Sequence, residues 1–186
     1  TGSLYGGGND TSATVNGATT ITVSGKVLGD QGIFGGGLNA NVTGTITGTG
    51  YPVLTGQTEI TVPTSHSTFV TVTATGEVPS GDVHGGSRGS GTVAENTIVD
   101  FQGIKERENG KVKDFDHSIY GGGQGTVGGD SYVSLTVPVA NNATSNDNHI
   151  FGGGDVAGVT GTSHLYINIT IPGEDNNYSV VANVYG

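Results

Sequence analysis

Leu4-Tyr5-Gly6-Gly7-Gly8 places an aliphatic residue, an aromatic residue and three glycines in a row, and this order recurs along the whole chain. Close copies begin at Ile33, Ile119 and Ile150, a weaker copy begins at Val83, and a partial copy begins at Val184. The aromatic position is thus filled in turn by Tyr5, Phe34, His84, Tyr120, Phe151 and Tyr185. A motif that returns at intervals of roughly 20 to 50 residues is typical of solenoids, propellers and repeat arrays.

A second pattern lies between successive copies: an aliphatic residue, usually a glycine two positions later, and aliphatic residues six and eight positions after the first. In order along the chain, its five copies are Val15, Gly17, Ile21, Val23; Leu54, Gly56, Ile60, Val62; Val93, Glu95, Val99, Phe101; Val127, Gly129, Val133, Leu135; and Val159, Gly161, Leu165, Ile167. A spacing of two is the periodicity of a β-strand.

Stacking of the repeats would align these aliphatic residues in interior columns, so that neighbours bury a core that no single repeat could bury alone. The first expected column contains Ile21, Ile60, Val99, Val133 and Leu165, the second Val23, Val62, Phe101, Leu135 and Ile167, and the third the aliphatic residues that precede each aromatic. We therefore predict an all-β fold, a β-solenoid of about five irregular rungs in a single domain over residues 1–186. A propeller is the alternative, but its blades need about 40 residues each and most of these intervals are shorter.

Two segments depart from a regular array and suggest inserted hairpins, at 58–78 and 99–119. The second contains Asn109-Gly110, a strong signal for a tight hairpin turn, between short runs of mixed charge. For the first segment, a further irregular rung beginning near Asn41-Val42-Thr43-Gly44 is an alternative.

Composition agrees with strands and turns and excludes several partners. The chain has 36 glycines, no cysteine, methionine or tryptophan, and only six basic residues for a formal net charge of −10. Such a charge argues against nucleic acid and anionic membranes as partners. No apolar run approaches the length of about 18 residues that would suggest a membrane span. No signal peptide precedes Thr1, which suggests a mature or excised segment.

The Tyr/Phe-Gly-Gly-Gly units, each followed by Val-x-Gly and a Thr-rich strand, resemble the β-solenoid repeats of large bacterial surface proteins such as adhesins and autotransporter passenger regions. The resemblance covers essentially the whole chain, and its motifs are structural, with no catalytic residue among them. It implies a right-handed parallel β-helix located outside the cell or at its surface and used for adhesion or as a spacer.

These observations favour a non-enzymatic structural or adhesive role, as a surface adhesin segment or the subunit of a self-assembling filament. Leu4 and Tyr5 at one end, and Val184 and Tyr185 at the other, are the expected contacts for head-to-tail stacking with another copy or with neighbouring repeats of a longer chain. The alternative is a carbohydrate-binding module. Because each aromatic directly follows a core aliphatic, strand alternation sends the aromatics to the opposite face, where a ladder of rings could bind glycans.

Other chemistries have weaker signals, and no cofactor is expected. Asp10, Asp130 and Asp155 follow glycines as in calcium-binding repeats, but they lack the tandem nine-residue spacing by which adjacent turns share an ion. The five histidines never recur at i, i+4, and the one dense cluster of acids and bases lies on the expected second hairpin, so we expect no enzyme. Thr-x-Thr sequences, such as Thr20-Ile21-Thr22, leave an ice-binding face as a further alternative.

Overall fold

The computed structural model of the chain is all-β in every part that it describes. The described residues are 2–24, 32–47, 65–73, 81–102, 107–108, 111–112, 117–136, 149–167 and 183–186. They form fifteen strands and no helix. Within these ranges there is accordingly no helix long and apolar enough to cross a membrane.

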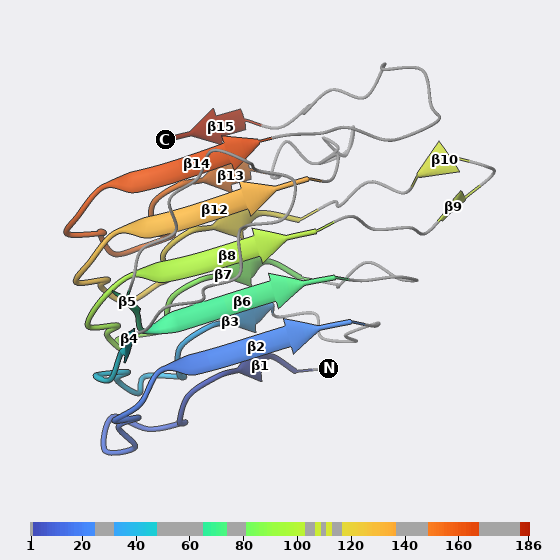
Figure 1. The fold of residues 1–186 in the computed structure, drawn as a ribbon. Helices are drawn as coiled ribbons and strands as arrows, with labels where there is room; N and C mark the ends of the chain where they lie inside the picture. The colour runs from blue at the N-terminus through green and yellow to red at the C-terminus, as the bar shows by residue number, and fades with distance from the viewer. Residues whose placement is uncertain are drawn as a thin grey trace.

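Two sheets of parallel strands make up most of the structure (Figure 1). The six-stranded sheet is built from β1 (Leu4–Tyr5), β3 (Ile33–Phe34), β7 (Val83–His84), β11 (Ile119–Tyr120), β13 (His149–Phe151) and β15 (Asn183–Tyr185), in that order. The five-stranded sheet has the order β14 (Ser163–Ile167), β12 (Ser131–Leu135), β8 (Thr97–Phe101), β6 (Thr68–Val72) and β2 (Thr19–Val23). The chain visits the two sheets alternately, so each sequence repeat contributes one strand to each.

The core lies between these two sheets. One cluster of buried residues joins the aliphatic positions of the six-stranded sheet, such as Ile33 and Ile119, to those of the five-stranded sheet, such as Val99 and Val133. The register aligns equivalent residues, since Val133 pairs with Val99 on one side and with Leu165 on the other. The interior columns predicted from the sequence are therefore confirmed for the described residues away from the two ends, whereas Leu4, Ile167 and Val184 at the ends of the columns are exposed.

The second repeat is different from the prediction. Val70 and Val72 of β6 pair with β2 and β8 in the places predicted for Ile60 and Val62, and the interpretation of 58–78 as an added hairpin was wrong for Thr68–Val72. Ile60 and Val62 lie outside the described residues. The reason is that Val42 forms parallel bridges with Val15 and Val93, so the aliphatic-x-glycine pattern of this repeat is Val42-Thr43-Gly44.

The extra residues of the second repeat thus fall inside the second pattern, between Gly44 and the strand that begins at Thr68. The alternative, a further irregular rung beginning near Asn41, is not found either, because Val42 pairs with the equivalent residues Val15 and Val93 and so belongs to the second repeat itself. A short antiparallel pair, β4 (Ile46–Thr47) with β5 (Ser65–His66), brings the two sides of the insertion together.

The predicted charged hairpin is present as a two-stranded antiparallel pair. β9 (Arg107–Glu108) pairs with β10 (Lys111–Val112), on either side of Asn109-Gly110, which lies outside the described residues. Val99 and Phe101, at the start of the predicted insertion 99–119, belong instead to β8 in the parallel sheet. The insertion therefore begins after the strand has ended.

The first glycine of the motif is required by close stacking in the first four copies, at Gly6, Gly35, Gly85 and Gly121. A Cβ atom built on Gly85 would lie 2.1 Å from the carbonyl oxygen of Gly121, and one built on Gly121 would lie 2.1 Å from that of Gly152. No side chain fits at this distance from backbone, so glycine is needed where successive repeats cross from one sheet toward the other.

Candidate functional site

The six aromatic positions form one continuous stack of rings on the six-stranded sheet. The rings follow one another in the order Tyr5, Phe34, His84, Tyr120, Phe151 and Tyr185. The distances between the centroids of successive rings in this order are 5.5, 4.3, 4.6, 4.9 and 4.8 Å. The interplanar angles do not exceed 19°. The aromatic ladder expected from the sequence is therefore present in the structure, and its rings are in the register set by the strand pairing.

This stacking decides which parts of the rings a ligand could touch. Each inner ring contacts a neighbouring ring on both faces, so only ring edges point away from the sheet. Phe34 and His84 are each only 2% exposed, whereas Tyr185 is 49% exposed. A sugar that stacks on a ring needs an open face, so the inner ladder does not offer the platform that the sequence suggested as an alternative.

A column of hydroxyl groups, which the sequence analysis did not identify, ties the two sheets together. The first residue of a strand in the five-stranded sheet donates to the first glycine carbonyl of the following motif. Thr68 Oγ1 donates to Gly85 O at 2.6 Å, and Thr97 Oγ1 donates to Gly121 O at 2.7 Å. Thr19 and Ser131 make the equivalent bonds. The sequence signal was a Thr or Ser two positions before the first core aliphatic of each strand. This signal is recognised only once the register is known.

His84 is the one ladder position without a Tyr or Phe. Its ring lies between Phe34 and Tyr120, and burial, with a smaller contribution from the Arg88 charge, lowers the pKa of His84 to about 3. The imidazole is therefore neutral at physiological pH. In the described part of the chain, no group forms a hydrogen bond with the buried Nδ1 atom of His84.

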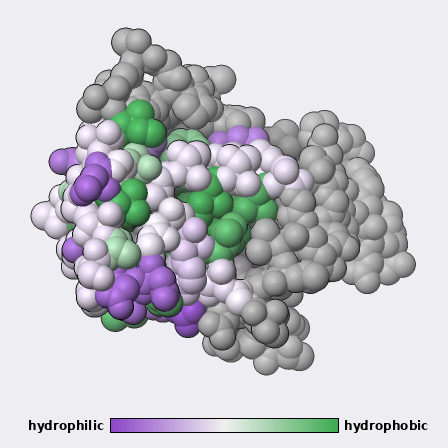
Figure 2. Space-filling view, turned by 90° about the horizontal axis from the view of Figure 1, so that it is seen from below, coloured by the Kyte–Doolittle hydropathy of each residue, from purple (hydrophilic) through white to green (hydrophobic). Residues whose placement is uncertain are grey.

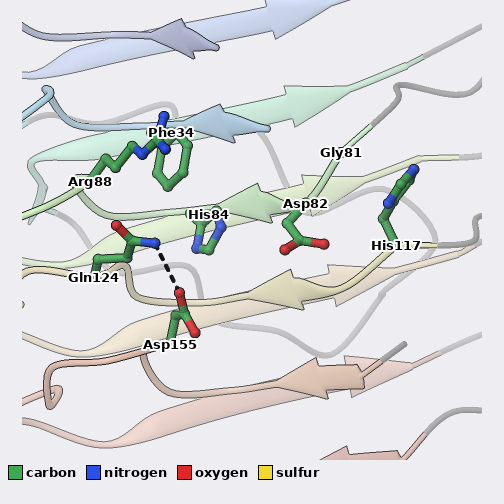
Figure 3. Close-up of a pocket in the computed structure, with 8 residues that line it drawn as sticks. All are labelled: Phe34, Gly81, Asp82, His84, Arg88, His117, Gln124 and Asp155. Carbon is green, nitrogen blue, oxygen red and sulfur yellow. Dashed lines mark hydrogen bonds between the residues drawn. The ribbon is translucent and has the colours of Figure 1, made fainter. Parts of the chain in front are cut away.

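A pocket of about 220 Å³ lies at the outer edge of the ladder, over Phe34 and His84 (Figure 3). Arg88, Gln124 and Asp155 form one side, and each stands four residues after the ladder aromatic of its own repeat. Asp82 and His117 lie on the other side in Figure 3, near the start of β7 and β11. The pocket is thus lined mainly by polar side chains from three successive repeats.

Hydrogen bonds hold several of these side chains in place. Asp82 Oδ1 accepts from the backbone N–H of Ser118 at 2.8 Å, which links two repeats. Gln124 Nε2 donates to Asp155 Oδ2 at 3.2 Å, while Gln124 Oε1 accepts from the backbone N–H of Gly89 at 3.1 Å. The carboxylates and the amide are therefore positioned by neighbouring repeats before any ligand arrives.

Arg88 reaches along the ladder toward its first ring. Its guanidinium carbon lies 5.7 Å from the centroid of Phe34, a cation–π distance. One terminal nitrogen donates to Tyr5 Oη at 2.9 Å and to Ser3 Oγ at 3.1 Å. These contacts fix the positive charge at one end of the pocket.

The three aspartates considered for calcium lie in separate places. Asp10 accepts hydrogen bonds from Thr11 and Ser12 in its own turn, and Asp155 is held by Gln124. Asp130 accepts from the backbone N–H of Thr162, the main reason that the pKa of its carboxyl lies below the usual value. Among the described residues, no three His, Asp or Glu side chains are grouped as a metal site would require.

The expected self-association residues lie on opposite edge strands of one sheet. Within the described residues, β1 pairs only with β3, and β15 pairs only with β13. Leu4 is 36% exposed, and Val184 and Tyr185 are about half exposed. Figure 2 looks onto the end formed by β1 and β2 and shows hydrophobic side chains gathered in its middle.

The register does not continue a Thr-x-Thr face across the five-stranded sheet. Thr20 is followed across the strands by Phe69, Ile98, Tyr132 and His164, and Thr22 by Thr71, Asp100, Ser134 and Tyr166. The threonine array that an ice-binding face would need is therefore interrupted at the second strand, where Phe69 takes the place next to Thr20.

In comparisons with known proteins, neither a family model, nor a curated protein, nor a solved structure matched this chain.

Proposed function

We propose that the chain folds as a right-handed parallel β-helix, a β-solenoid whose function is structural and adhesive. In this proposal each repeat is one coil, and the aromatic ladder and the hydroxyl column fix the stacking of the coils. Aromatic pairs of this kind contribute about 0.5–1.5 kcal/mol each beyond the area they bury. Such redundant stacking suits a segment that must stay rigid under load, as in a surface adhesin or a filament outside the cell.

The observation that carries the proposal is the pair of open, apolar edges. β1 and β15 each present one unpaired side within the described residues, and Leu4, Val184 and Tyr185 on these strands are exposed. Unpaired strand edges are templates for further pairing. Because all neighbours in this sheet are parallel and in register, the partner that fits β15 best is a strand equivalent to β1.

A second copy can supply that strand, with Leu4 aligned to Val184 and Tyr5 stacked on Tyr185. Contact between two different surfaces of the same molecule is heterologous, and it produces an open filament when the rotation does not close. The net charge of −10 opposes the contact at low salt, and physiological salt screens this repulsion.

Sedimentation velocity over a range of concentrations, together with electron microscopy, tests this proposal. We expect concentration-dependent oligomers or fibres that grow with ionic strength and are lost in Leu4→Asp and in Tyr185→Asp. Val156→Asp is the matched control, because Val156 is 77% exposed and lies outside the sheets. A monomer at all concentrations, or oligomers that survive both edge substitutions, would refute the filament.

A further inference from the structure

We infer that the pocket over Phe34 and His84 is a binding site for one uncharged sugar residue, held by its hydroxyl groups rather than by ring stacking. This inference goes beyond the structural role and does not depend on self-association. It rests on four features of the pocket: its size, the direction in which the rings point, the arrangement of polar groups and the balance of charge.

The size and the floor of the pocket fit a small ring that lies against ring edges. The volume of about 220 Å³ is below the range typical of drug-sized ligands, which begins near 300 Å³. Phe34 and His84 line the floor, and because their faces contact neighbouring rings, a ligand meets their edges. Apolar stacking therefore contributes little, and polar contacts must carry the affinity.

Polar groups on both sides converge on this space (Figure 3). Asp155 and Gln124 are hydrogen-bonded to each other on one side, and Asp82 stands on the other. A carboxylate beside an amide offers both acceptors and donors to adjacent hydroxyl groups, which themselves donate and accept. These groups are already fixed by neighbouring repeats, so a ligand loses little affinity in ordering them.

His84 supplies an independent indication of a missing partner. Its Nδ1 atom is buried and has no hydrogen-bond partner in the described part of the chain, although buried polar atoms in folded proteins almost always have one. The ring lines the pocket, and a ligand hydroxyl reaches this atom when the ring or its neighbours shift to expose it. A buried polar group without a hydrogen-bond partner lowers the stability of the protein when the pocket is empty. It therefore favours a ligand that supplies the missing hydrogen bond.

The charges around the pocket disfavour an acidic ligand, and Arg88 beside the two carboxylates leaves little excess charge to attract a cationic one. Asp82 and Asp155 are negative, Arg88 is positive, and the molecule as a whole carries a net charge of −10. An acidic sugar would face two carboxylates, and a cationic ligand would face the guanidinium that is fixed beside Phe34. A divalent cation is disfavoured because no metal-ligating group of three exists among the described residues.

Saturation-transfer NMR with defined probes tests the inference. The neutral probes are the methyl glycosides of glucose, galactose, mannose and N-acetylglucosamine, and the charged probes are glucuronic acid and sialic acid. We expect saturable binding of at least one neutral probe. Asp155→Ala and Gln124→Leu should each raise its Kd by about 10-fold or more. Asp10→Ala is the matched control, since Asp10 is an exposed acid in an equivalent turn outside the pocket.

Each outcome is decisive if thermal melting first shows that the variants are folded. The inference is overturned if no neutral probe saturates, if an acidic probe binds more tightly than every neutral one, or if Asp155→Ala and Gln124→Leu leave Kd within twofold. Filament formation by the same variants is measured separately, so failure of the sugar site leaves the structural role untouched.

Discussion

The buried histidine in the ladder makes the stability of this protein depend on pH in a way that can be calculated. The pKa of His84 is about 3 in the folded chain, against an ordinary value of 6.5. Between these two values the unfolded chain binds a proton at this position and the folded chain does not, so stability rises with pH. Stability from His84 is therefore complete above pH 6.5 and is lost as the pH falls toward 3.

The magnitude follows from the size of the shift. Each pH unit below 6.5 removes about 1.4 kcal/mol, so acidification from pH 7 to pH 4.5 should cost about 2–3 kcal/mol through this residue alone. The groups nearest to the imidazole are Arg88, Asp82, Asp155 and His117 around the pocket, with Tyr120 stacked on its face. The Arg88 charge beside the imidazole adds to the effect of burial and opposes its protonation.

His84→Phe isolates this contribution, because Phe already occupies the equivalent ladder positions of two other repeats. We expect urea unfolding to show that the wild-type protein loses about 2–3 kcal/mol more than His84→Phe between pH 7 and pH 4.5. Carboxylates and the other histidines are present in both proteins, so their titration cancels in the difference. Equal losses in the two proteins would refute the claim that the ladder requires a neutral imidazole.

Three further predictions concern the stacking itself and are measured by thermal or urea unfolding. Val70→Asp should prevent folding, because Val70 is fully buried in the core between two paired strands and the aspartate would have no partner there. Gly121→Ala should cost more than about 2 kcal/mol, since its Cβ would lie 2.1 Å from the carbonyl oxygen of Gly152, whereas Gly158→Ala, with nothing within 4 Å, should change stability by less than about 0.5 kcal/mol. Thr97→Val should cost about 1–3 kcal/mol by leaving the carbonyl of Gly121 without its buried donor, and a cost below about 0.3 kcal/mol would show that the hydroxyl column is dispensable.

Repetition made the sheets predictable, and irregularity limited the prediction in the second repeat. The aromatic-glycine motif recurs with little change, so the core aliphatic residues beside it could be assigned from order alone. In the second repeat, both Ile60 and Val70 lie in alternating segments, and local periodicity cannot choose between them. The choice is made by pairing with β2 and β8, a long-range interaction that depends on where the insertion begins. The hydroxyl column was missed for a related reason: a Thr in a strand is common, and its role appears only when the glycine carbonyl of the next repeat is placed beside it.

The pocket could not be predicted because it is made from the residues in which the repeats differ. Arg88, Gln124 and Asp155 occupy the same position relative to the ladder in three successive repeats, and along the sequence they look like unrelated variation outside the motif. Because the repeats stack in parallel and in register, these three residues lie next to one another in the structure. The pocket therefore has a cation, an amide and a carboxylate along one side. The residues that recur in every repeat build the stack. Their rings and carbonyls contact the next repeat, so they are not available to bind a ligand. Chemistry in such a fold must therefore come from the positions that change from one repeat to the next, and His84, the one departure within the ladder itself, lies at the floor of the pocket.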